Sequence, residues 1–179
     1  TGGAGTILFN NTLNGNHKLD LSAGTNSITF DNLVGNSNPL DNLTINGGLN
    51  LATTIKLTGG FVQNGANPVN LGGSITTTTG TIDLNGAVTL TGDSTLNTSA
   101  GDIRFLNPIN GNNGTESLNL SAETGTIKLP ETIGSTTQIG NLTILSGNLD
   151  IPTTARINLT GNFQLNGANP LNFAGEVTT

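Results

Sequence analysis

The sequence contains no cysteine, methionine, tryptophan or tyrosine, and its six phenylalanines are its only aromatic residues. Without cysteine, disulfides, thiol catalysis and cysteine-based zinc sites are excluded. Charged residues make up only 9% of the 179 residues, and the formal net charge is −6. This charge disfavours nucleic acid and anionic membrane surfaces as partners, because both attract basic patches. No apolar run approaches the roughly 18 residues of a membrane span, so we predict no membrane insertion.

Small and turn-forming residues are abundant instead, since 30 Thr, 28 Asn and 26 Gly make up nearly half of the chain. The apolar residues alternate with polar ones in short triplets, which places the apolar side chains on one face of a strand. Examples are Leu19-Asp20-Leu21, Ile55-Lys56-Leu57, Ile103-Arg104-Phe105 and Leu142-Thr143-Ile144. Asn-Gly, Gly-Gly and Asn-Pro pairs separate the triplets and favour turns. The pattern predicts an all-β fold of many very short strands, with no substantial helix.

Several segments occur twice, at a separation that drifts from 96 to 102 residues. The pairs are GTILF (Gly5–Phe9) with GDIRF (Gly101–Phe105), DNLTINGG (Asp41–Gly48) with GNLTILSG (Gly140–Gly147), and FVQNGANPVNLGG (Phe61–Gly73) with FQLNGANPLNFAG (Phe163–Gly175). Self-similarity at a nearly fixed period indicates a repeat architecture. The drift predicts small insertions, which we expect to lie in turns.

These features together predict one parallel β-solenoid over residues 1–179, with about 8–9 coils. A sandwich has longer strands and wider turn spacing, whereas a solenoid accepts strands with two or three inward residues. The solenoid should consist of two imperfect repeats of about 100 residues, at about 1–96 and 97–179, with the second incomplete. Both ends fall within a repeat, so we expect the chain to be a window on a longer array.

Two steps of the repeat resemble a known group of proteins. They are G-[AT]-V-T-L-x-G-D-[ST]-T-L at Gly86–Leu96 and G-N-L-T-[IV] at Gly140–Ile144. With the surrounding sequence they resemble the repeat regions of filamentous-haemagglutinin-like and related β-strand-repeat exoproteins, which are large bacterial adhesins. The resemblance implies a right-handed parallel β-helix, secretion to the cell surface or medium, and a role in adhesion, biofilm or extracellular filaments.

The sequence predicts no catalytic, cofactor-binding or metal site. The single histidine, His17, should be exposed in a turn, because no second ligand type lies near it. The acidic residues are scattered, at Asp20, Asp31, Asp41, Asp83, Asp93, Asp102, Glu116, Glu123, Glu131, Asp150 and Glu176. Only stacking of coils could gather them, and a groove with clustered Asp, Arg and Lys would favour a polysaccharide-active enzyme.

Three smaller patterns also give expectations. Lys56 and Arg156 occupy nearly equivalent positions of the repeat. They should be solvated outward residues, or basic residues that each pair with an acidic residue one coil away. The Asn of N-x-[ST] sequons should form Asn and Thr ladders and not carry glycans; these are Asn10, Asn42, Asn97, Asn113, Asn119, Asn141 and Asn158. The NGANP motif should be a corner followed by a strand, with Pro68 and Pro170 at the strand start. The inward side chains should then be Val69, Leu71, Leu171 and Phe173.

We therefore expect a structural shaft segment of an extracellular bacterial adhesin or surface filament, with no enzymatic activity and no cofactor. Its expected partners are further copies of itself end to end or the continuation of the same chain, and glycans or a host or neighbouring cell surface. A glycan- or surface-binding β-helix module is the alternative. The Thr-rich run Ser74–Ile82 suggests such a face, for glycans or ice, although a regular Thr-x-Thr array on every coil is missing.

Overall fold

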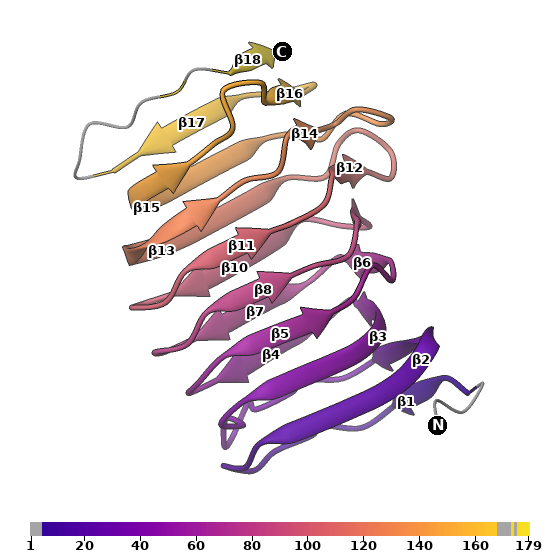
Figure 1. Cartoon of the computed structure of the whole chain (residues 1–179). Helices are drawn as coiled ribbons and strands as arrows, with labels where there is room; N and C mark the ends of the chain where they lie inside the picture. The colour runs from indigo at the N-terminus through magenta and orange to yellow at the C-terminus, as the bar shows by residue number, and fades with distance from the viewer. Residues whose placement is uncertain (1–4, 168–172, 174) are drawn as a thin grey trace.

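The computed structural model describes residues 5–167, 173 and 175–179. Their chain winds into a parallel β-solenoid of about eight turns, with its N-terminal and C-terminal coils at opposite ends of the stack (Figure 1). Over these residues there is no helix, and the strands of successive coils pair in parallel. The predicted all-β solenoid is therefore confirmed.

Eighteen strands are described, and they join into one continuous sheet. They are β1 (Ile7–Phe9), β2 (Leu19–Phe30), β3 (Leu43–Leu51), β4 (Thr54–Leu57), β5 (Phe61–Asn64), β6 (Val69–Leu71), β7 (Ser74–Thr77), β8 (Ile82–Leu84) and β9 (Val88–Leu90). They continue with β10 (Ser94–Thr98), β11 (Ile103–Phe105), β12 (Ile109–Gly111), β13 (Leu118–Lys128), β14 (Thr132–Ile133), β15 (Leu142–Asp150), β16 (Arg156–Asn158), β17 (Phe163–Asn166) and β18 (Glu176–Thr178).

The pairings divide the solenoid into three faces. Face 1 holds β1, the last residues of β2 and β3, and then β6, β9, β12, β14, β16 and β18. Face 2 holds β4, β7, β10, the first residues of β13 and β15, and β17. Face 3 holds the first residues of β2 and β3, then β5, β8, β11 and the last residues of β13 and β15. Each coil crosses all three faces in turn.

Four strands are longer than the triplet pattern predicts. β2, β3, β13 and β15 run for 9 to 12 residues because they continue around a corner from one face to the next. The register of β2 against β3 shifts between Ser22 and Ser27, at a bend that includes Gly24 with a φ of 62°. Bending within a strand, through a bulge or a glycine, thus replaces some of the expected turns.

Apolar side chains stack in columns along the axis and form the core. On face 1 the column is Ile7, Ile28, Leu49, Val69, Val88, Ile109, Ile133, Ile157 and Val177. Most of these side chains are fully buried, and beside them the rings of Phe9 and Phe30 stack with centroids 5.1 Å apart. Each fully buried aliphatic side chain stabilises the fold by roughly 1.5–3 kcal/mol, so the columns need neither disulfides nor many aromatic residues.

Glycines stack at the corner that leads from face 2 to face 3. A Cβ on Gly80 would clash with the backbone of Gly59 and Gly60, one on Gly101 would clash with the Gly80 carbonyl, and one on Gly125 would clash with the Gly101 carbonyl. Two buried hydroxyls hold the same corner, since Thr77 and Thr98 donate to the Gly80 carbonyl oxygen at 2.6 and 3.0 Å. The backbones of successive coils therefore approach too closely here for any side chain.

We predict that Gly80→Ala lowers the stability of the solenoid by about 1–3 kcal/mol, because the added methyl group overpacks the corner. The matched control is Gly92→Ala, since the nearest atom to a Cβ at Gly92 is the Gly72 carbonyl oxygen at 3.4 Å. Urea unfolding followed by circular dichroism measures both. Equal midpoints for the two variants would contradict the close approach at Gly80.

The repeated segments lie on different faces in their two copies. Phe61 is on face 3 and its counterpart Phe163 is on face 2. Likewise Ile7 is on face 1 and its counterpart Ile103 is on face 3. On face 3, the column from Phe61 to Leu149 passes through β8, β11 and β13 and covers four full turns. After Leu149 the chain crosses face 1 and reaches Phe163 on face 2, which adds two-thirds of a turn. The spacing between copies is thus four and two-thirds turns, so each copy is rotated by one face.

Most of the extra residues of the second copy lie outside the strands, as predicted, but one lies within β15 at its bend, where the spacing rises from 99 at Gly147 to 100 at Leu149. The spacing rises from 96 to 99 residues between Ile109 and Leu118, where residues 112–117 form a corner loop. It rises again across residues 151–155, which connect β15 to β16. Insertions in these corners leave the inward columns in register, which explains how the repeat length can drift.

Candidate functional site

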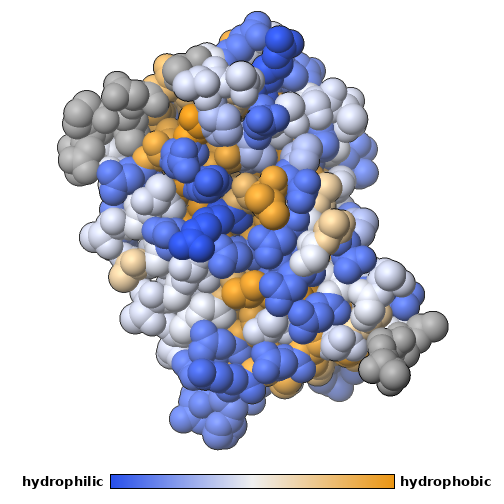
Figure 2. Space-filling model, in the orientation of Figure 1, coloured by the Kyte–Doolittle hydropathy of each residue, from blue (hydrophilic) through white to orange (hydrophobic). Residues whose placement is uncertain are grey.

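A column of charged side chains points outward from face 3 over four consecutive coils. Its members are Asp83 on β8, Arg104 on β11, Lys128 on β13 and Asp150 on β15, each in register with the next. Lys128 Nζ lies 3.5 Å from Asp150 Oδ2. We call these four residues the charged column. Figure 2, in the same orientation as Figure 1, shows hydrophilic residues over much of the visible surface, with hydrophobic patches between them.

Arg104 lies between two carboxylates. Its Nη2 donates to Asp102 Oδ2 at 2.9 Å, and its Nη1 lies 3.7 Å from Asp83 Oδ1. A hollow of about 230 Å³ beside them is lined by Asp83, Asn85, Arg104, Phe105, Leu106 and Lys128. Leu106 is 68% exposed on its rim. Stacking of coils has therefore gathered acidic and basic residues that are far apart in the sequence.

The two carboxylates beside Arg104 are shifted in opposite directions. Burial raises the pKa of Asp83; the positive charge of Arg104 opposes this shift and the negative charge of Asp102 adds to it. The pKa of Asp102 is lowered, first because its Oδ1 accepts the Thr126 N–H at 2.9 Å and second because Arg104 donates to its Oδ2. Acid–base sites often contain two carboxyls whose pKa values are shifted apart by their surroundings, so this cluster is the candidate site.

We predict that Asp102→Asn lowers the urea midpoint of the solenoid at neutral pH, whereas Asp83→Asn leaves it unchanged or raises it. A carboxyl with a lowered folded-state pKa stabilises the fold above its ordinary pKa of about 3.9, and this contribution is lost as the pH falls through the folded-state value. The pKa of Asp83 is raised in the folded state, so the ionised Asp83 carboxylate destabilises the fold at neutral pH.

Unfolding midpoints measured from neutral pH to below pH ~3.9 test these signs. The urea midpoint of Asp102→Asn should lie below that of the parent at neutral pH, and this difference should shrink as the pH falls. A difference of constant size across that range would show that the ionisation of Asp102 does not stabilise the fold.

The single histidine lies where the sequence predicts. His17 is exposed in a bend before β2. Lys56 is exposed, and its Nζ donates to Asn36 Oδ1 at 3.3 Å; the side chain of Arg156 is also exposed, opposite Glu176 in the register of β16 and β18. Pairing with a carboxylate one coil away is instead seen at Arg104 and Lys128, which the sequence did not single out.

Asn ladders do form, but mostly not at the sequons. Asn70 Nδ2 donates to Asn50 Oδ1 at 2.8 Å, and Asn64 Nδ2 donates to Asn46 Oδ1 at 3.0 Å. The sequon residues Asn42 and Asn141 bind turns instead, since each Oδ1 accepts a backbone N–H of the next coil, from Gly60 at 2.7 Å and from Asn162 at 2.8 Å. These two residues are counterparts in the repeat, so the same corner contact occurs on two faces.

The Thr-rich run does not form a flat array. Thr76 points outward, but Thr77 points into the core and is buried. Thr78 and Thr79 are exposed beyond the end of β7. Because alternate side chains of a strand point to opposite sides, consecutive threonines cannot all face solvent on one surface.

The first NGANP motif is a corner followed by a strand, as predicted. Gly65 has a φ of 83°, Pro68 directly precedes β6, and Val69 and Leu71 are buried. In the second copy, Pro170 and Leu171 lie outside the described residues, and Phe173 packs against the core as a partly buried residue.

The buried polar residues were not predicted, and Gln63 and Glu116 are the two largest of them. Gln63 is fully buried; its Nε2 donates to the Gly47 carbonyl oxygen at 2.9 Å and its Oε1 accepts the Gly86 N–H at 2.8 Å. Glu116 is 5% exposed and accepts N–H groups of Asn113 and Gly114 at 2.9 and 3.0 Å. Desolvation raises the pKa of Glu116, but backbone N–H groups of residues 113–116 outweigh it and lower the pKa. Both residues hold corners.

Among the described residues, no group of three or more His, Cys, Asp or Glu side chains is placed to hold a metal ion. The same residues form no helix that could span a membrane. Comparisons of the chain with protein-family models, with curated proteins and with solved structures gave no match. The functional proposal is therefore based on the geometry and on the sequence resemblance described above.

Proposed function

We propose that this chain is a structural shaft segment of an extracellular bacterial adhesin or surface filament. The observation that supports it is the unbroken inward column of face 1, which continues through all nine levels from Ile7 to Val177. Parallel backbone ladders along three faces and an apolar core resist bending and stretching along one axis. Such a rod carries another module at a distance from the cell.

The bacterial and extracellular parts of the proposal depend on the resemblance to β-strand-repeat exoproteins. The absence of cysteine is compatible with it, because the stacked coils bury enough apolar surface without disulfides. In the proposed filament the next partner along the axis is a further coil, from the same chain or from another copy. Glycans or cell surfaces contact the outward faces.

We predict that native, unfractionated material contains continuous rods with an axial reflection near 4.8 Å, the spacing of stacked strands. Electron microscopy with a power spectrum of the rods measures this. Short particles of uniform length would contradict the filament. Labelling of intact cells with an antibody against the chain tests the location, and an interior-only signal would contradict the extracellular assignment.

A second candidate function is acid–base chemistry on a polysaccharide at the charged column. The observation that favours it is the divergence of the pKa values of Asp83 and Asp102 beside Arg104, next to a hollow. Against it, Arg104 is already paired with both acids and Lys128 with Asp150. The structural proposal is preferred because each of these two cations already lies beside a carboxylate of the chain, although Asp83 Oδ1 is buried and accepts no hydrogen bond from the described residues.

Incubation with polygalacturonate separates the two candidates. For a shaft we expect neither unsaturated products nor new reducing ends above a buffer blank. Cleavage by the parent chain that is lost in Asp83→Asn, while the variant stays folded by circular dichroism, would favour the enzyme. Cleavage that persists in the variant would point to a contaminant.

A further inference from the structure

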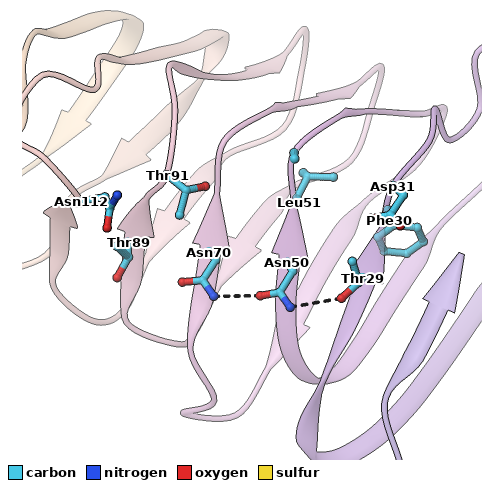
Figure 3. A pocket seen from close by; sticks show the side chains of 10 residues that line it. Thr29, Phe30, Asp31, Asn50, Leu51, Asn70, Thr89, Thr91 and Asn112 are labelled. Carbon is cyan, nitrogen blue, oxygen red and sulfur yellow. Dashed lines mark hydrogen bonds between the residues drawn. The ribbon is translucent and has the colours of Figure 1, made fainter. Parts of the chain in front are cut away.

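A second hollow, of about 330 Å³, lies on face 1 and contains no part of the charged column. Its polar lining comes from Thr29, Asn50, Asn70, Thr89, Thr91 and Asn112, which project from successive coils (Figure 3). The volume is at the lower end of the roughly 300–1,000 Å³ that is usual for ligand sites. We call this hollow the amide groove.

The amides on one side of the groove form an oriented chain of hydrogen bonds. Asn70 Nδ2 donates to Asn50 Oδ1 at 2.8 Å, and Asn50 Nδ2 donates to Thr29 Oγ1 at 3.1 Å (Figure 3). These bonds fix the orientation of both amides. Each Nδ2 still carries a second hydrogen, so the row is rigid but keeps hydrogen-bonding capacity.

The other end of the groove is free to bind. Over the part of the chain that the structure describes, the side chains of Thr89, Thr91 and Asn112 donate to and accept from no other group of the chain. Thr91 and Asn112 are exposed. Hydroxyl and amide groups that both donate and accept therefore lie beside a row that is already oriented.

The charge of the groove restricts its ligand. Asp31 is its one ionisable lining residue, and no Lys or Arg lines it. An anionic polymer would meet a negative charge without a compensating cation. Strand addition by a peptide is also disfavoured, because the backbone groups of this face already pair with the coils on either side.

We propose that the amide groove binds a neutral oligosaccharide that lies along the solenoid axis. Sugar hydroxyls both donate and accept hydrogen bonds, as do the amides and hydroxyls that meet them here. The coils present these groups at intervals of about 4.8 Å, so a chain of sugar rings meets the same kind of contact repeatedly. This proposal specifies one glycan contact on an outward face of the proposed shaft, and its test does not depend on whether the chain forms filaments.

The test is titration of the ¹⁵N-labelled chain with maltohexaose, cellohexaose and chitohexaose at millimolar concentration, followed by the side-chain amide signals. We expect at least one of these neutral probes to shift the signals of Asn50, Asn70 and Asn112. The anionic polymer polygalacturonate should leave them unchanged. If none of the three neutral probes shifts these signals, the proposal is wrong.

The variant Asn112→Ala removes a groove side chain that makes no hydrogen bond within the described chain. The variant should therefore stay folded. It should weaken binding about tenfold, as expected for one or two lost hydrogen bonds. The matched control is Asn64→Thr, which breaks the other amide pair, with Asn46 on face 3, and should leave the affinity unchanged. Equal affinity in Asn112→Ala and the parent, or equal weakening in both variants, would overturn the assignment.

Discussion

The stacking of each coil on the next in parallel register is the constraint on which the rest of the structure depends. Once Leu49 lies over Ile28 and Val69 over Leu49, every neighbouring residue of the strand has its position fixed as inward or outward. A slip of one residue would turn the whole inward set to solvent. This explains why the coils vary in length at their corners, either in loops such as residues 112–117 or where a strand bends, as between Ser22 and Ser27 of β2.

The alternation of residues was enough to predict the short strands and their inward side chains, since apolar triplets such as Ile82-Asp83-Leu84 are buried at both ends. It could not predict Gln63, because a polar residue at the inward position that follows Phe61 breaks the alternation of the strand Phe61–Asn64. Its burial depends on the Gly47 and Gly86 backbone groups, which only the fold brings near. The charged column was missed for the same reason, because the register that joins Asp83 to Arg104 is a property of the stacked coils.

The rotation of the repeat by one face shows how little the three faces differ in the core. The same segment pairs on face 3 as Leu43–Asn46 and on face 2 as Leu142–Leu145, with its two inward apolar side chains buried in both places. The local sequence determines that a segment forms a strand followed by a corner. The coil beneath the segment determines on which face that strand lies. A unit of four and two-thirds turns can therefore stack in either rotational position, provided that apolar columns continue beneath it.

The two copies have diverged in the chemistry of several outward positions. Thr29 and Asn50 of the amide groove are the counterparts of Lys128 and Asp150 of the charged column. Leu8, which is 57% exposed, is likewise the counterpart of Arg104. One strip of the repeat thus carries amides and hydroxyls on face 1 and ion pairs on face 3. Because the core is fixed by stacking and the outward row is not, the repeat can acquire different surfaces without a change of fold.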